Sequence, residues 1–236
     1  MNIITQLVVL ALSLLLVHAG DKADDKVIYS CCDLKIVPQN RLPYGSGVYQ
    51  LDTKFGKFTT TDVYCDMNTD NGGWIVIQRN RKGSHLNFNK NWRDYEDGFG
   101  DPNGDFWAGL KLIYILTHTG QWEMRVDYQK LDKTWSYLHY KQFSVGGASQ
   151  EYPLIVGWFA GTGTDWFASS RPLNGMKFST PDNDNDGSSS FHCAANYRSG
   201  WWHNNCFHAN LNMQPPQVGA HALFVEMKIR PKNCAQ

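Results

Sequence analysis

The chain has 236 residues, a length that allows one sizeable domain or two small ones. Its 22 Lys and Arg residues balance its 22 Asp and Glu residues, so the formal net charge is zero. Nucleic-acid binders carry a basic face that neutralises phosphates. The basic cluster at 79–82 is expected to be a solvated strand end, so the charge pattern argues against a nucleic-acid partner.

Residues 1–19 are predicted to be a signal peptide. A polar opening precedes an apolar stretch from Leu7 to Val17, and Val17-His18-Ala19 offers a cleavage site. The apolar stretch is too short to cross a bilayer, which takes about 20 residues. We therefore expect a secreted, extracellular protein with no membrane insertion.

Residues 20–30 form a short polar segment that is expected to be a flexible leader. They contain no heptads and no Gly-x-y repeat, so no oligomerising stalk is encoded there. The oligomeric state stays open.

Short segments with turn residues between them dominate the rest of the chain. Most are apolar or alternating runs typical of strands, and 110–116 favours a short helix that ends before Gly120. The predicted strands are 47–51, 61–67 (with Val63 and Cys65 on one face), 74–78, 122–128, 154–159 (expected to be buried) and 222–229. Residues 169–216 show almost no periodicity, and long loops of this kind are usually functional or held by disulfides or metals.

Six cysteines are present, at positions 31, 32, 65, 193, 206 and 234. An even number in an oxidising compartment predicts three disulfides. The count alone leaves about 15 pairings open.

The acidic run 182–187, DNDNDG, is the strongest local signal for a metal site. Carboxylates at alternate positions repel one another unless water or a cation screens them, and Ca²⁺ prefers oxygen ligands of this type. An EF-hand does not fit, because Cys193 stands where that loop needs a bidentate Glu. The run therefore predicts either a different Ca²⁺ loop, which we favour, or a polar turn.

A second stretch, 193–212, combines aromatic and polar residues next to two cysteines. Trp201, Trp202 and His203 could belong to a site for a small polar ligand, or the Trp pair could be core. His192, His203, His208 and His221 lack the close spacing of zinc ligands, and no nucleophile elbow or phosphate-binding loop occurs. We therefore expect that the protein is not an enzyme.

Several stretches together resemble the fibrinogen C-terminal globular domain of ficolins, tachylectin-5 lectins, angiopoietin-like proteins and the fibrinogen chains. They occur in the family's order and cover nearly all of 31–231: VYCDMNTDNGGWIVIQRN (63–80), NWRDYEDGFGDPNGDFWAGL (91–110), EMRVDY (123–128), KFSTPDNDND (177–186), SGWWHNNC (199–206), ANLN (209–212) and VEMKIRP (225–231). The resemblance implies one fibrinogen C-terminal domain at 31–234. Its expected class is α+β, with a mixed, mainly antiparallel central sheet, short helices and a long irregular C-terminal region that binds calcium.

The resemblance also implies two disulfides, Cys31–Cys65 and Cys193–Cys206. We predict that the remaining cysteines, Cys32 and Cys234, bond to each other and tie the chain ends together. The alternative is that these two cysteines form intermolecular disulfides between two copies of the chain.

In the family, two Asp side chains and two nearby carbonyls hold the calcium. By resemblance these are Asp184 and Asp186, with carbonyls near Ser188 and Ser190, and Asp182 is expected to lie just outside the ligands. The resemblance also implies a ligand pocket beside the calcium, with a cis Asn205–Cys206 peptide. Its expected residues are Tyr197, His203, Asn205, Cys206, Phe207 and His208.

Two departures from the family affect that pocket. Phe207 replaces a His common in acetyl-binding lectins, and the segment 213–221 is much shorter than the family's loop. The resemblance therefore implies a Ca²⁺-stabilised recognition protein, lectin-like toward acetylated glycans in innate defence. The alternative is an extracellular protein-binding ligand or matrix module of angiopoietin-like type that uses the same C-terminal surface.

Overall fold

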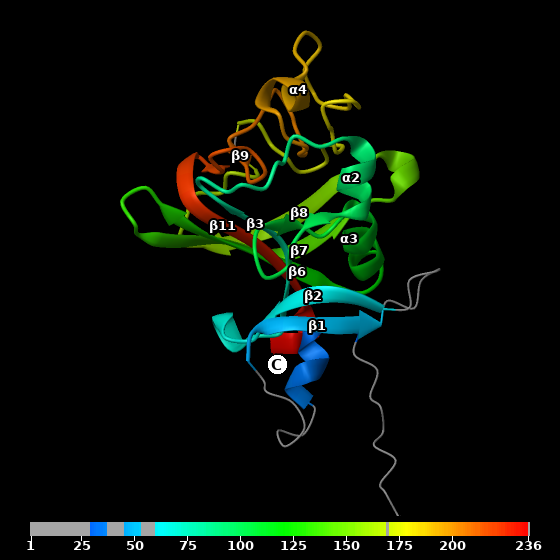
Figure 1. The fold of residues 1–236 in the computed structure, drawn as a ribbon, viewed down its shortest axis with the longest axis vertical. Coiled ribbons are helices and arrows are strands. Elements are labelled where there is room, and N and C mark those ends of the chain that lie inside the picture. Colours follow the sequence, from blue (N-terminus) through cyan, green and yellow to red (C-terminus); the bar gives the residue numbers. More distant parts are fainter. Residues whose placement is uncertain (1–28, 37–44, 53–59, 169, 236) are drawn as a thin grey trace, which may run out of the picture.

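The computed structural model describes residues 29–36, 45–52, 60–168 and 170–235 (Figure 1). The predicted signal peptide and all but the last two residues of the predicted leader lie outside the described residues. Among the described residues, no helix has the length and apolar character needed to cross a membrane.

The helices are short and the strands carry most of the regular structure. The helical elements are η1 (Cys31–Ile36), η2 (Thr69–Asn71), α2 (Trp92–Asp97), α3 (Leu110–Thr117), η3 (Ala148–Gln150), α4 (Cys193–Tyr197) and η4 (Lys232–Ala235). The strands are β1 (Gly47–Asp52), β2 (Thr60–Asp66), β3 (Trp74–Arg81), β4 (Phe99–Gly100), β5 (Phe106–Trp107), β6 (Trp122–Lys130), β7 (Trp135–Val145), β8 (Leu154–Gly161), β9 (Ala209–Asn210), β10 (Gln217–Val218) and β11 (Ala220–Pro231).

The strands form one sheet whose main path runs β1-β2-β3-β11-β6-β7-β8. Every strand pairing in the described part of the chain is antiparallel. The last strand, β11, lies in the middle between β3 and β6, so both of its edges are paired. In Figure 1 the irregular segment with α4 lies above the central strands of the sheet, and β1, β2 and the C-terminus lie below them. The predicted α+β class and the mainly antiparallel sheet are confirmed. The described residues contain no parallel pairing, so the expected mixed character of the sheet is not seen in them.

Two of the segment predictions need correction. The run 154–159 was expected to be buried, but β8 is an edge strand that pairs only with β7 in the main path, and Trp158 is 68% exposed. β7 itself was not predicted, because polar residues interrupt its apolar ones on both faces. The basic cluster at 79–82 is only partly solvated: Arg79 and Asn80 are buried, since Arg79 forms an ion pair with Glu226 on β11 at 2.6 Å.

An aromatic cluster attaches the irregular C-terminal region to the rest of the domain. Phe178 stacks on Trp107 of β5, with ring centroids 5.7 Å apart, and meets Tyr95 of α2 at 5.2 Å. Trp202 contacts Phe178 at 5.1 Å, and its indole N–H donates to the Tyr152 carbonyl at 2.8 Å. The Trp pair that the sequence left open is therefore core, because Trp201 and Trp202 are fully buried.

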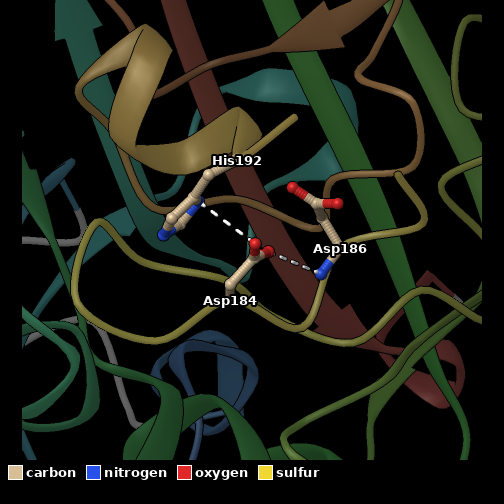
Figure 2. Close-up of side chains that lie close together, drawn as sticks. All are labelled: Asp184, Asp186 and His192. Atoms are coloured by element: carbon tan, nitrogen blue, oxygen red, sulfur yellow. Dashed lines mark hydrogen bonds and ion pairs between the residues drawn. The ribbon is translucent and has the colours of Figure 1, made fainter. Parts of the chain in front are cut away.

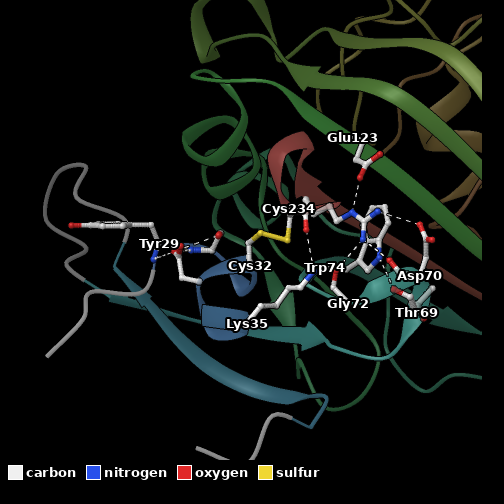
Figure 3. The surroundings of a disulfide bond; sticks show 12 residues. Tyr29, Cys32, Lys35, Thr69, Asp70, Gly72, Trp74, Glu123 and Cys234 are labelled. Carbon is white, nitrogen blue, oxygen red and sulfur yellow. Dashed lines mark hydrogen bonds and ion pairs between the residues drawn. A yellow bond between two sulfur atoms is a disulfide. The ribbon is translucent and has the colours of Figure 1, made fainter. Parts of the chain in front are cut away.

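All six cysteines form intrachain disulfides. The pairs are Cys31–Cys65, Cys193–Cys206 and Cys32–Cys234, so the intrachain prediction for the last pair is confirmed. Figure 3 shows how Cys32 on η1 meets Cys234 on η4, where the Lys35 ammonium donates to the Cys234 carbonyl at 3.0 Å. Gly73, with φ of +78°, leaves room for this bond, because a Cβ there would lie 2.4 Å from the Cys234 sulfur.

A buried ion cluster joins β11 to its neighbouring strands. The Lys228 ammonium lies 2.6 Å from Asp66, 2.8 Å from Asp127 and 2.9 Å from Glu226. Burial alone would lower the pKa of Lys228, but the three carboxylates outweigh it and raise this pKa above its usual value. The same ammonium holds the pKa of Asp66 well below its usual range despite burial.

Replacing Lys228 by Met should therefore destabilise the domain strongly. The change leaves Asp66 without its cation and removes the ammonium that it shares with Asp127 and Glu226, which keep only Arg125 and Arg79. Breaking a buried ion cluster costs about 3–5 kcal/mol. Urea unfolding at neutral pH measures the loss. Lys111→Met is the control, since Lys111 pairs with Asp97 at the surface and its loss should cost less than about 1 kcal/mol. Equal stability of the two variants would contradict the prediction.

Candidate calcium and ligand site

Three potential metal ligands gather in the acidic loop. Asp184, Asp186 and His192 each offer one ligand atom, and these atoms lie within 4.8 Å of one another (Figure 2). The Asp184 carboxylate accepts a hydrogen bond from the Asp186 N–H at 3.2 Å, and its other oxygen lies 3.7 Å from His192 Nδ1. The arrangement collects two negative charges in a half-exposed loop.

The backbone holds Asp186 firmly in place. One of its oxygens accepts from the Ser188 N–H at 2.7 Å and the other from the Cys193 N–H at 2.8 Å. Burial raises the pKa of Asp186, the charge of Asp184 raises it further, and the two N–H groups oppose both. A cation at this point would relieve the repulsion between the carboxylates, and each oxygen keeps a lone pair to bind it.

The residues fit a hard cation such as Ca²⁺, which takes carboxylate and carbonyl oxygens. Asp184 and Asp186 would supply the carboxylates, as the resemblance implies, and the carbonyls near Ser188 and Ser190 stay predicted ligands. His192 was considered in the sequence only for zinc, and its place beside the carboxylates was missed. The available signal was its position directly before Cys193, whose N–H binds Asp186.

Asp182, which was expected to lie just outside the ligands, makes contacts that do not involve the other carboxylates. Its carboxylate accepts hydrogen bonds from the Trp92 N–H at 2.9 Å and the Thr180 hydroxyl at 2.7 Å. It is not one of the three grouped ligands. Asp182 therefore ties the start of α2 to the acidic loop.

Exposed aromatic side chains lie beside the acidic loop, at the end of α4. Tyr197 is 38% exposed and packs edge-on against Phe207, with ring centroids 4.7 Å apart. Phe191, which the sequence analysis did not single out, is 43% exposed and contacts Tyr197 at 6.3 Å. The Cys193–Cys206 disulfide joins α4 to the chain that carries Phe207, and the Asn205–Cys206 peptide is cis. Phe207 itself is buried, at 8% exposure, beneath Tyr197. We call the exposed Phe191 and Tyr197, with Phe207 beneath them, the aromatic surface.

The other predicted ligand residues divide between the surface and the interior. Asn205 is exposed and Cys206 is buried in its disulfide, both next to Phe207. His208 is half-buried; its ring meets Trp166 at 6.0 Å and its Nε2 lies 3.1 Å from the Ser170 hydroxyl.

His203 was expected to contact a ligand, but it is fully buried beneath the aromatic surface. Its ring lies 5.6 Å from that of Phe207, and its Nε2 donates to the Ser199 carbonyl at 3.2 Å. Its Nδ1 is buried and has no hydrogen-bond partner among the described residues. His203 therefore supports Phe207 from inside, and the packing of the Trp pair next to it explains the burial.

This burial predicts a pH-dependent loss of stability. Burial lowers the pKa of His203 to about 4, below its unfolded value of about 6.5. Between these values the unfolded chain binds a proton that the folded chain does not, so stability is full above pH 6.5 and falls toward pH 4. The contribution is at most about 3 kcal/mol.

Urea unfolding across that pH range, with the parent and His203→Gln compared, tests the prediction. The variant should lose less stability on acidification, whereas the control His118→Gln, at an exposed position, should follow the parent. Parallel curves for the parent and His203→Gln would show that His203 does not titrate in this way.

Comparisons with known proteins agree with this geometry. The family model described as "Fibrinogen beta and gamma chains, C-terminal globular domain" matches residues 39–221. Fibrinogen C domain-containing protein 1 of Mus musculus is 42% identical over 192 residues, which are 72% of this chain and 40% of that protein. Fibrinogen-like protein 1 of Bos taurus is 43% identical over 164 residues, 64% of this chain and 51% of that protein. The chain thus spans about half or less of the length of these curated relatives.

Solved structures show the same fold. The fibrinogen-like globe domain of human ANGPTL2 is similar with a TM-score of 0.76 and 30% identity, covering 86% of this chain and 99% of that one. A lamprey fibrin D-dimer in complex with the peptide Gly-His-Arg-Pro-amide is similar with a TM-score of 0.74 and 25% identity, covering 97% and 84%. The chain belongs to the family of fibrinogen C-terminal globular domains.

Proposed function

We propose that this chain is a secreted, Ca²⁺-stabilised recognition module with no catalytic role, and that the aromatic surface contacts its ligand. The observation that carries the proposal is the direct link between the carboxylate pair and that surface. Asp186 accepts from the N–H of Cys193, the first residue of α4, and Tyr197 is the last.

Calcium would act at the acidic loop by charge compensation. The ion would keep Asp184 and Asp186 ionised and close together, which is costly for two carboxylates alone. With Asp186 ionised, its hydrogen bond to Cys193 is charge-assisted and therefore stronger. The start of α4 is then held in place, and with it the position of Tyr197.

The first candidate ligand is an acetylated glycan. Tyr197, supported from below by the buried Phe207, offers an apolar aromatic face of the kind that packs against an acetyl methyl group. The nearby Asn205 is exposed, and its amide can donate and accept hydrogen bonds. Phe207 removes one polar contact that a His would supply, so the affinity should be low for a single site. Glycan capture would suit a role in innate defence.

The second candidate ligand is an extracellular protein, as for an angiopoietin-like or matrix module. Exposed aromatic side chains such as Phe191 and Tyr197 are typical of the residues that dominate protein interfaces. The similar lamprey fibrin structure holds a peptide, which supports this class of ligand for the fold.

The calcium proposal predicts a Ca²⁺-dependent gain in thermal stability. The parent should melt higher with Ca²⁺ than with EDTA, since an ion that binds only the folded chain stabilises it. Asp184→Asn should lose this difference and melt like the parent in EDTA. Asp182→Asn is the matched control: it should lower Tm equally with and without Ca²⁺, because Asp182 holds α2 instead. A parent Tm that ignores Ca²⁺ would defeat the proposal.

Retention on immobilised N-acetylglucosamine separates the two ligand classes. If the glycan proposal is right, the parent binds in Ca²⁺ and elutes with EDTA, and Tyr197→Ala binds at least about tenfold more weakly. Trp135→Ala, at an exposed aromatic position on β7, should bind like the parent. No retention of the parent in Ca²⁺ would reject acetylated glycans and leave the protein-ligand class.

A further inference from the structure

The short segment 213–221 borders a second cavity that the aromatic surface does not include. Its volume is about 620 Å³, within the range of about 300–1,000 Å³ of small-molecule sites. Three parts of the chain meet there: the β6–β7 turn, the loop 162–166 after β8, and the β10–β11 turn. None of the aromatic-surface residues lines it.

Small residues in the β10–β11 turn let this part of the chain lie directly against Trp166. Gly219 has φ of +72°, and a Cβ there would lie 2.3 Å from the Trp166 indole. Its N–H donates to the His208 carbonyl at 2.8 Å, which holds the turn against the domain. Ala220 and Ala222 follow, and both line the cavity.

The cavity has an apolar floor and a mainly polar rim. The floor is made by the buried residues Tyr128, Val218 and Ala222, with Trp166 half-buried at the side. The polar residues of the rim are exposed: Lys130, Asp132, Thr162, Thr164 and His221. Leu131 and Ala220 are exposed apolar residues of the same rim.

The rim offers both donors and acceptors without an excess of charge. The Thr162 hydroxyl accepts from the Tyr137 N–H at 3.1 Å, so its own hydrogen is available to a ligand. One oxygen of Asp132 accepts from Thr134, and these hydrogen bonds hold the pKa of Asp132 below its usual range. Asp132 is thus an acceptor at neutral pH, and the ammonium of Lys130 balances its charge.

A pyranose matches this combination. One face of the ring carries C–H groups that pack on aromatic side chains, and its hydroxyls each donate and accept. A charged ligand would be attracted by one of Lys130 and Asp132 and repelled by the other, so the rim favours neither anions nor cations. We propose that the cavity between the β6–β7 turn, the loop 162–166 and the β10–β11 turn binds a neutral sugar.

This inference extends the glycan form of the proposed function to a second position on the chain. The two positions are neighbours, because the ring of His208 contacts Trp166 and His208 follows Phe207 directly. The aromatic surface and the cavity would then bind successive sugar residues of one oligosaccharide.

Saturation-transfer NMR on the full chain in Ca²⁺ tests the proposal, with the methyl α-glycosides of glucose, galactose and mannose as separate probes. Transfer to at least one of them is expected. Ala220→Phe, which fills the cavity from its exposed edge, should weaken that binding at least about tenfold. Ala148→Phe makes the same change at an exposed position on η3 and should leave it unchanged.

His221→Ala, an exposed rim change, gives a second reading that does not depend on how a bulky Phe is accommodated, and it should weaken binding several-fold. No transfer from any glycoside, or full transfer to both cavity variants, would overturn the second site. Loss of transfer in Tyr197→Ala alone would also overturn it, since the sugar would then lie on the aromatic surface. Retention of the parent on N-acetylglucosamine is a separate measurement, so the second site can fail while the glycan proposal stands.

Discussion

Aromatic packing is the constraint on which the functional half of this molecule depends. Among the described residues between β8 and β11, only α4, β9 and β10 are regular, so the region lacks the continuous strand pairing that holds the sheet. Scattered backbone hydrogen bonds, such as the pair between Ser179 and Trp201, hold it in part. Phe178 packs against Tyr95 and Trp107, and Trp202 packs against Phe178 and Trp107. Trp201 extends the cluster through Trp202 and Phe167. Truncating one such buried ring costs about 3–5 kcal/mol, a large share of a domain's stability. The acidic loop and the aromatic surface therefore rest on a rigid base, although their own chain is irregular.

Two kinds of crosslink complete what the aromatic cluster begins. The Cys193–Cys206 disulfide closes the short loop that carries α4, and the hydrogen bond from Cys193 to Asp186 joins the same point to the acidic loop. The carboxylates of Asp184 and Asp186 are thereby connected to Tyr197 through one hydrogen bond and the short helix α4. A cation bound there would strengthen the hydrogen bonds of Asp186 to Ser188 and Cys193, and would in this way fix the position of the aromatic surface.

The sequence predicted the parts of this molecule that local pattern and family resemblance carry. The central strands followed from their apolar runs. Two disulfides and the proximity of Asp184 and Asp186 followed from the resemblance, and the third disulfide was predicted from the two cysteines that remained. The surroundings of His192, His203 and Trp158 could not be predicted, because they depend on tertiary contacts between distant parts of the chain. His192 joins the carboxylates only because Cys193 turns the chain back, and His203 is buried only because Trp201 and Trp202 are core. Trp158 is exposed because β8 lies at the sheet edge, although its run is as apolar as that of a central strand.

The shortened segment 213–221 is the point at which loss of a family feature and gain of a new one coincide. A shorter segment removes side chains from the ligand region, but Gly219 also lets this part of the chain lie directly against Trp166, which lines a cavity together with Tyr128. Single sugar sites are weak, and binding gains strength when two sites engage one ligand, because the second contact is made at a high effective concentration. All six cysteines are used within the chain, so no free thiol remains to link copies into a covalent multimer. Two neighbouring positions on one chain would raise the strength of glycan capture without such a link, and the loss of the longer loop would then be a change of binding mode.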